Sequence, residues 1–169
     1  MVNKNDRRQS QQKYFISNRE KLRLHRRAYK AQQQDHSEVC GVSIIDQRGY
    51  ISFEFLKNYS AQPGRYALRL SDVRSIKRSI SQYGKRLLGT FHSHPLSEAI
   101  PSLRDRKNGF YRGIELIYDV CGRELKLWQQ LSRGRKKILR ELPLVLEKRR
   151  KPKRRKKGDQ QQFCTSSMG

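Results

Sequence analysis

Residues 86–105 read RLLGTFHSHPLSEAIPSLRD, and most of the chemistry that the sequence offers lies in this stretch. Its first part, 86–92, is short and mostly apolar, which predicts a buried strand. Two histidines, His92 and His94, stand at the end of that run with one residue between them. We therefore expect a strand that ends in a His-x-His pair.

Proline and glycine mark a helix after this strand. Pro101 can open the helix near Ser102 and Gly109 can close it, because proline is favoured in the first helical turn and glycine just after the last. Ser102 and Asp105 are three residues apart, so on a helix they share one face. If the helix folds back over the end of the strand, Asp105 comes close to the two histidines.

Two imidazoles and one carboxylate form a typical ligand set for catalytic zinc. Residues i and i+2 of a strand point the same way, so His92 and His94 can both reach one zinc ion at about 2.0–2.1 Å. With Asp105 as the third ligand, the fourth position stays open for water, as in catalytic rather than structural sites. Zinc lowers the pKa of its bound water to about 7. Glu38 is the candidate general acid/base, and Ser102 can donate a hydrogen bond to the developing oxyanion. We expect one zinc ion per chain.

The segments around this stretch predict an α+β fold with a mixed sheet. Residues 38–45 and 50–56 are expected to form a β-hairpin, since both are rich in apolar, branched and aromatic residues. Further strands are expected over 113–120 and 124–131, about a Cys-Gly turn, with 66–70 as another candidate. A helix is expected from N-caps at Ser71 or Asp72, through Val73, Ile76 and Ile80, to Gly84.

The chain divides into four expected parts. Residues 1–13 are polar and predict a flexible arm, and 14–34 predict a helix that is docked by a broad apolar face or used as a partner surface, as in a homodimer. Residues 35–146 form the domain, with a last amphipathic stretch, 136–146, that Pro143 interrupts. Residues 147–169 are expected to be a disordered basic tail.

Composition limits the function classes. The chain has 169 residues, long enough for one domain with a proper core. Its 39 Lys and Arg against 15 Asp and Glu give a net charge of +24, which favours contact with polyanions such as nucleic acid through the basic tail.

We expect no membrane span, since no apolar run is long enough. With no export signal and three cysteines of irregular spacing, we expect a cytoplasmic protein with reduced thiols. Cys40 is expected to be a packing residue.

The site residues, taken together, resemble the JAMM motif of the MPN (Mov34/PAD-1, JAB) zinc metalloproteases. His92-Ser93-His94-Pro95 with Ser102 and Asp105 match that motif, and Glu38-Val39-Cys40-Gly41 is similar to the Glu-x-Cys-Gly segment of the family's first strand. The resemblance extends over about 38–131. Further similar positions are Leu56-Lys57-Asn58, Pro63 and Gly89-Thr90-Phe91.

The resemblance implies a fold, an activity and a role for each site residue. The fold is a β-sheet flanked by helices with zinc at one edge. The activity is hydrolysis of a peptide or isopeptide bond after the C-terminal glycine of a ubiquitin-like protein, by deconjugation or precursor processing. By the same resemblance, His92, His94 and Asp105 bind zinc, Glu38 is the acid/base residue and Ser102 the oxyanion donor. The short spacers resemble the compact prokaryotic form of the domain.

Two alternatives stay open at the level of sequence. The same site could serve a peptidase of sulfur metabolism that processes sulfur-carrier proteins. The chain could also be a nucleic-acid-associated accessory protein similar to the RadC branch, which shares the spacing of the motif. That branch has Asn where Ser93 stands and Ser-Gly where this chain has Leu96-Ser97, so its match is poorer.

Overall fold

The computed structural model describes residues 13–108, 111–133 and 136–147. Within these residues the chain forms an α+β fold in which helices flank one mixed, eight-stranded sheet, as the sequence predicted. The order of the strands across the sheet is β7-β6-β5-β4-β2-β3-β1-β8. The strands are β1 (Tyr14–Ser17), β2 (Cys40–Ile45), β3 (Tyr50–Leu56), β4 (Arg86–His94), β5 (Ile114–Asp119), β6 (Glu124–Arg133), β7 (Lys136–Leu142) and β8 (Leu144–Glu147). The helices are α2 (Asn18–Asp35), α3 (Leu70–Ser81) and α4 (Leu103–Asn108), with a short 3-10 turn at Tyr111–Gly113.

The centre of the sheet mixes parallel and antiparallel pairs. β2 pairs antiparallel with β3 and with β4, β4 pairs parallel with β5, and β5 and β6 form an antiparallel hairpin. β4 therefore has a strand on each side, and its carboxyl end lies in the interior of the sheet rather than along an edge strand.

Two separate hydrophobic clusters hold α2 and α3 on opposite faces of the sheet. Leu24 and Ala28 of α2 pack in a cluster that includes Phe91 of β4. Val73 of α3 packs in the other cluster with Val42 of β2. Phe91 pairs with Gly41, the neighbour of Val42, so the two clusters lie on opposite sides of the strands. No helix in the described part of the chain is long and apolar enough to cross a membrane.

The N-terminal segment differs from the predicted helix over 14–34. Residues 14–17 form β1, which pairs in parallel with β3 and with β8, and α2 begins only at Asn18. Ser17 ends the strand and caps the helix, because its hydroxyl accepts a hydrogen bond from the Glu20 N–H at 3.2 Å. The apolar residues that suggested a helical face are therefore divided between a buried strand and a helix.

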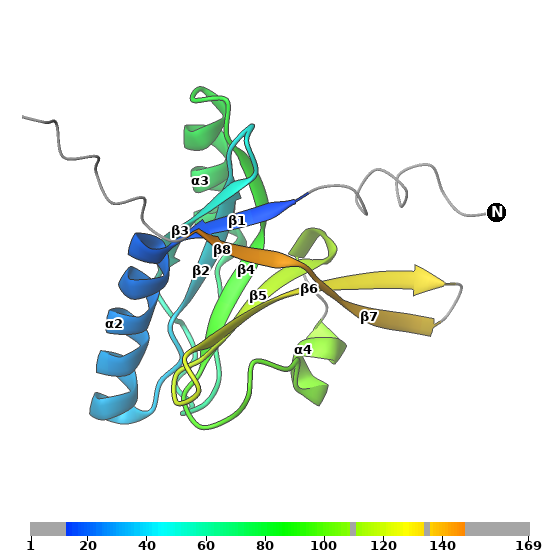
Figure 1. Cartoon of the computed structure of the whole chain (residues 1–169). Coiled ribbons are helices and arrows are strands. Elements are labelled where there is room, and N and C mark those ends of the chain that lie inside the picture. The colour runs from blue at the N-terminus through cyan, green and yellow to red at the C-terminus, as the bar shows by residue number, and fades with distance from the viewer. Residues whose placement is uncertain (1–12, 109–110, 134–135, 148–169) are drawn as a thin grey trace, which may run out of the picture.

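The C-terminal stretch also differs from the prediction. Residues 136–146 were expected to be an amphipathic stretch, interrupted at Pro143, in a helical or irregular end of the domain. The break does fall at Pro143, but the stretch forms β7 and most of β8. β8 lies beside β1 although the two come from opposite ends of the chain (Figure 1). The sheet therefore pairs a strand from the start of the described residues with a strand from their end. The predicted arm, apart from Lys13, and the basic tail beyond Glu147 lie outside the described residues.

Smaller differences lie between β3 and α4. Residues 66–70 do not form a strand: 66–69 are irregular, and α3 begins at Leu70 after Arg69, without a cap from Ser71 or Asp72. β4 runs two residues further than predicted, to His94. The helix expected near Ser102 is α4, which begins at Leu103. Gly109, its predicted end, lies outside the described residues.

A candidate metal centre at the end of strand β4

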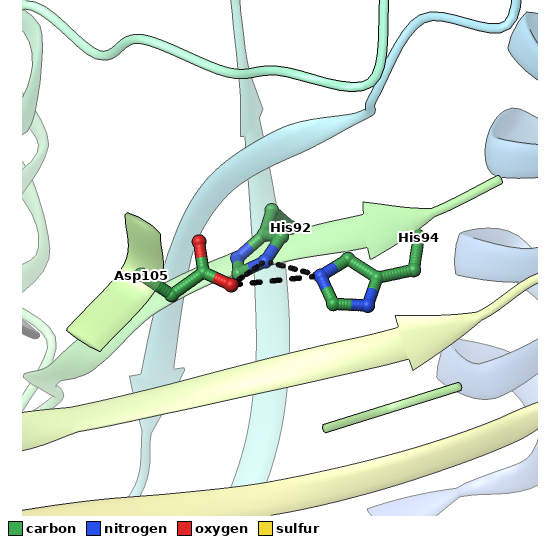
Figure 2. A group of neighbouring side chains, drawn as sticks. All are labelled: His92, His94 and Asp105. Atoms are coloured by element: carbon green, nitrogen blue, oxygen red, sulfur yellow. Dashed lines mark hydrogen bonds and ion pairs between the residues drawn. The ribbon is translucent and has the colours of Figure 1, made fainter. Parts of the chain in front are cut away.

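Three potential ligands meet where β4 ends and α4 begins. His92 and His94 are the last histidines of β4, and Asp105 lies in the first turn of α4. The Nε2 atoms of His92 and His94 are 3.0 Å apart. Asp105 Oδ2 lies 3.6 Å from His92 Nε2 and 3.7 Å from His94 Nε2. Figure 2 shows the three side chains pointing toward one another. All three are buried, so their convergence is part of the packed fold.

The outer nitrogen of each imidazole has an acceptor beside it. His92 Nδ1 lies 2.9 Å from Glu115 Oε1, and His94 Nδ1 lies 2.6 Å from the carbonyl oxygen of Glu98. A carbonyl and a carboxylate can only accept, so each Nδ1 carries the hydrogen and, in the neutral ring, each Nε2 has a free lone pair. Those two lone pairs and Asp105 Oδ2 face the same point. This donor set fits a cation, and two imidazoles with one carboxylate suit zinc.

Glu115 on β5 is a partner of the candidate site that the sequence analysis missed. Its side chain is 1% exposed, and its Oε1 also accepts hydrogen bonds from the Tyr66 hydroxyl at 2.5 Å and the Thr90 hydroxyl at 3.4 Å. Burial by itself lowers the pKa of His92, but the adjacent Glu115 carboxylate and Asp105 raise it to about 10. A positive charge is thus strongly favoured at this point of the fold. The available signal was a single acid within the apolar run IELIYD.

Tyr66 closes the site from the irregular segment before α3. Its ring stacks on the His92 imidazole with centroids 4.4 Å apart and an angle of 19° between the planes. The segment is held in place by Asn58, whose side-chain amide donates to the carbonyls of Glu38 and Arg65. The contact depends on the irregular path of 66–69, which differs from the strand that the sequence predicts for 66–70.

Ser102 and Asp105 hold each other at the start of α4. The backbone N–H of Ser102 donates to Asp105 Oδ2 at 2.7 Å, and the Asp105 N–H donates to the Ser102 hydroxyl oxygen at 3.2 Å. Burial raises the pKa of the Asp105 carboxyl, but its interactions with His92 and His94 outweigh that effect and hold the pKa well below its ordinary value. Asp105 is therefore ionised.

A small pocket of about 120 Å³ opens beside these residues and contains the other predicted site residue, Glu38. Glu38 is 8% exposed, and burial raises the pKa of its carboxyl. Its carboxylate is not among the three converging ligand groups, so Glu38 lies in the pocket beside them. The lining residues are Glu38, Gly64, Arg65, Tyr66, His94, Ser97, Ser102, Arg104 and Asp105.

Cys40 does not join the ligand group. It is buried, and burial raises the pKa of its thiol to about 12. A thiol with that pKa stays protonated near neutral pH and neither binds a metal nor attacks a substrate readily. Packing is therefore the role that its surroundings support.

The fold and this arrangement define a class: an α+β domain with a candidate mononuclear metal centre at the carboxyl end of an interior strand. Residues 22–131, well over half of the chain, match the family model described as prokaryotic homologs of the JAB domain. The chain belongs to this family.

Individual relatives are more distant. A desampylase of Haloferax volcanii is 33% identical over 88 residues, which cover 50% of this chain and 62% of that protein. The aligned part is thus less than two thirds of the relative's length. A protein of Desulfitobacterium hafniense, solved in solution, superposes with a TM-score of 0.61 at 18% identity, over 80% of this chain and 94% of its own. A JAB1/MPN domain protein from Archaeoglobus fulgidus gives a TM-score of 0.45 at 16% identity, over 80% of this chain and 98% of its own.

Proposed function

We propose that this protein is a zinc-dependent peptidase or isopeptidase that hydrolyses the bond after the C-terminal glycine of a ubiquitin-like protein. The observation that carries the proposal is the convergence of two Nε2 lone pairs and one carboxylate oxygen beside a pocket that contains a separate buried carboxylate. Membership of the JAB family and the similarity to a desampylase support the same reaction class.

In this proposal His92, His94 and Asp105 hold the zinc ion. When bound, zinc lowers the pKa of a coordinated water to about 7 and polarises the substrate carbonyl. Glu38 takes the proton of the attacking water and later delivers it to the leaving amine. Its raised pKa suits both steps, because a group that gives and takes a proton near neutral pH works best when its pKa is close to the working pH.

Ser102 and the pocket walls act on the substrate. The Ser102 hydroxyl already accepts from the Asp105 N–H, so its own hydrogen can point into the pocket and stabilise the oxyanion that develops on the scissile carbonyl. A pocket of about 120 Å³ admits a narrow chain and excludes bulky side chains. That size suits a substrate that ends in small residues such as glycine.

Glu38→Gln tests the proposal. The amide keeps the size of the side chain but cannot accept the proton, so we expect kcat to fall by about 10²–10⁴. The assay is cleavage of a panel of ubiquitin-like proteins that end in Gly-Gly, each fused to a reporter, by zinc-loaded wild type and variant. Glu54→Gln is the matched control, because Glu54 is exposed on β3. Cleavage that survives unchanged in Glu38→Gln would rule out this mechanism.

A further inference from the structure

The segment between the candidate ligands exposes large apolar side chains. Leu96 is 73% exposed, Ile100 41% and Leu103 75%, and all three lie between His94 and Asp105. Single exposed leucines are common on protein surfaces, but three large apolar side chains exposed along one ten-residue segment that borders a site favour an interaction surface. We call these three exposed side chains, Leu96, Ile100 and Leu103, the apolar rim.

The backbone that carries the apolar rim is fastened to the domain at successive carbonyls. The Glu98 carbonyl accepts from His94 Nδ1 at 2.6 Å, the Ala99 carbonyl from Trp128 Nε1 at 2.8 Å, and the Pro101 carbonyl from Arg106 Nε at 3.2 Å. The Pro95 carbonyl accepts from the side-chain amide of Gln32 on α2. The apolar side chains are therefore presented by a fixed backbone, and binding a partner would cost little ordering entropy.

The apolar rim continues in two directions. Ser97, Ser102 and Arg104, which alternate with its members along the chain, line the catalytic pocket. On the other side Ile100 borders a hollow of about 310 Å³ between α4 and the β6–β7 hairpin. Apolar residues of this hollow are Pro101, Trp128 and Leu139, and its cationic residues are Arg106 and Lys137. No acidic side chain lines it among the described residues.

We propose that the apolar rim and the adjoining hollow bind the folded body of the protein substrate, through an apolar patch bordered by acidic side chains. This inference rests on the proposed function. The catalytic pocket has room only for an extended tail, so the body attached to that tail must lie on the surface beside the pocket mouth. That surface is apolar at the rim and basic around the hollow, which is complementary to an apolar patch with acidic neighbours.

The test compares two substrates that share the same scissile sequence. One is a Gly-Gly ubiquitin-like fusion that the wild type cleaves, and the other is a peptide of its last six residues linked to a fluorogenic amine. For the double variant Leu96→Ser, Leu103→Ser we expect KM for the fusion to rise about tenfold or more, since truncating buried interface anchors commonly costs more than 1 kcal/mol each. Values of kcat at saturating fusion and of kcat/KM for the peptide should stay unchanged.

A matched control is the double variant Leu70→Ser, Tyr83→Ser. These side chains are 58% and 71% exposed on and just after α3, away from the rim. The control should leave KM for the fusion unchanged. The charge reversal Lys137→Glu should raise KM for the fusion. Added salt should also raise the wild-type KM for the fusion, because it screens the attraction between basic and acidic side chains.

The outcomes separate the two proposals. An unchanged KM for the fusion in the rim variant, or an equal loss on fusion and peptide, overturns the docking surface and leaves the proposed function intact. A wild-type dimer that dissociates in the rim variant without a change in KM makes the rim a self-association face, and also overturns the inference. Wild-type enzyme that carries zinc and cleaves no member of the panel of Gly-Gly fusions overturns the proposed function, and the docking surface with it.

Discussion

His92 Nδ1 lies 2.9 Å from Glu115 Oε1, and that carboxylate oxygen also accepts from Tyr66 and Thr90. These contacts determine which nitrogen of His92 carries the hydrogen and hold the ring plane, which Tyr66 also covers by stacking. A carboxylate behind a metal-binding histidine raises the basicity of the ligand and fixes its orientation. At this scale, Glu115 supports the candidate ligand His92 without being one of the three converging ligand residues.

Replacing Glu115 with Gln should lower zinc affinity by about 10–100-fold, because the neutral amide is a weaker acceptor for the Nδ1 hydrogen and leaves less negative charge behind the ring. The measurement is competition for zinc against a chromogenic chelator. Glu124→Gln is the control, since Glu124 is half-exposed on β6 and pairs only with Lys126 among described residues. Equal zinc affinities in wild type and Glu115→Gln would contradict this role.

Among the elements, β4 determines the position of the site. The close packing around this strand leaves little space for a larger side chain. β4 is buried from Leu87 onward and pairs on both sides: His92 lies between β2 and β5, and His94 pairs with β5. Gly89 lies where β4 approaches the start of β5, and a Cβ at this position would overlap the carbonyl oxygen of Ile114. The register that sets Thr90 opposite Glu115 therefore depends on the absence of a side chain at Gly89.

Gly89→Ala should destabilise the protein by about 1–3 kcal/mol, the usual cost of forcing extra volume into a packed core. The free energy of unfolding is measured by urea titration. Gly64→Ala serves as the comparison, because its Cβ would meet nothing within 4 Å and only its φ of +61° is unfavourable, at about 1 kcal/mol. A smaller loss for Gly89→Ala than for Gly64→Ala would show that β4 can shift without cost.

For the whole molecule, the candidate site brings together groups from separate parts of the fold. The ligands come from β4 and α4, Glu115 comes from β5, and Tyr66 comes from the segment before α3. Because unfolding disperses these groups, a cation that binds only the folded chain stabilises all of it.

Zinc should therefore raise the thermal midpoint, with about 2.7 kcal/mol of added stability when free zinc is 100 times its dissociation constant. The measurement is thermal unfolding in zinc and in EDTA, together with metal content by mass spectrometry, where about one zinc per chain is expected. The double variant His92→Ala, His94→Ala should contain no zinc and show no shift. A midpoint that is the same in zinc and in EDTA for the wild type would argue against a metal site.

Local sequence was enough for the features that depend on short spacing. The two-residue period of a strand puts His92 and His94 on one side, and the three-residue spacing of Ser102 and Asp105 matches a helix start. The apolar runs predicted the central strands β2, β3 and β4, and the helical spacing of Val73, Ile76 and Ile80 predicted α3. The family resemblance carried by these residues is confirmed by the match over 22–131.

Only the tertiary structure decided the features that depend on contacts between distant segments. Residues 14–17 become a strand because β3 and β8 offer partners on both sides, although the local pattern favoured a helix. Residues 136–147 likewise form strands through β6 and β1. Glu115 and Tyr66 join the candidate site through contacts that span 23 or more residues. Local periodicity reports which face of an element is apolar, but it contains no information about which distant segment will supply a hydrogen bond or a neighbouring strand.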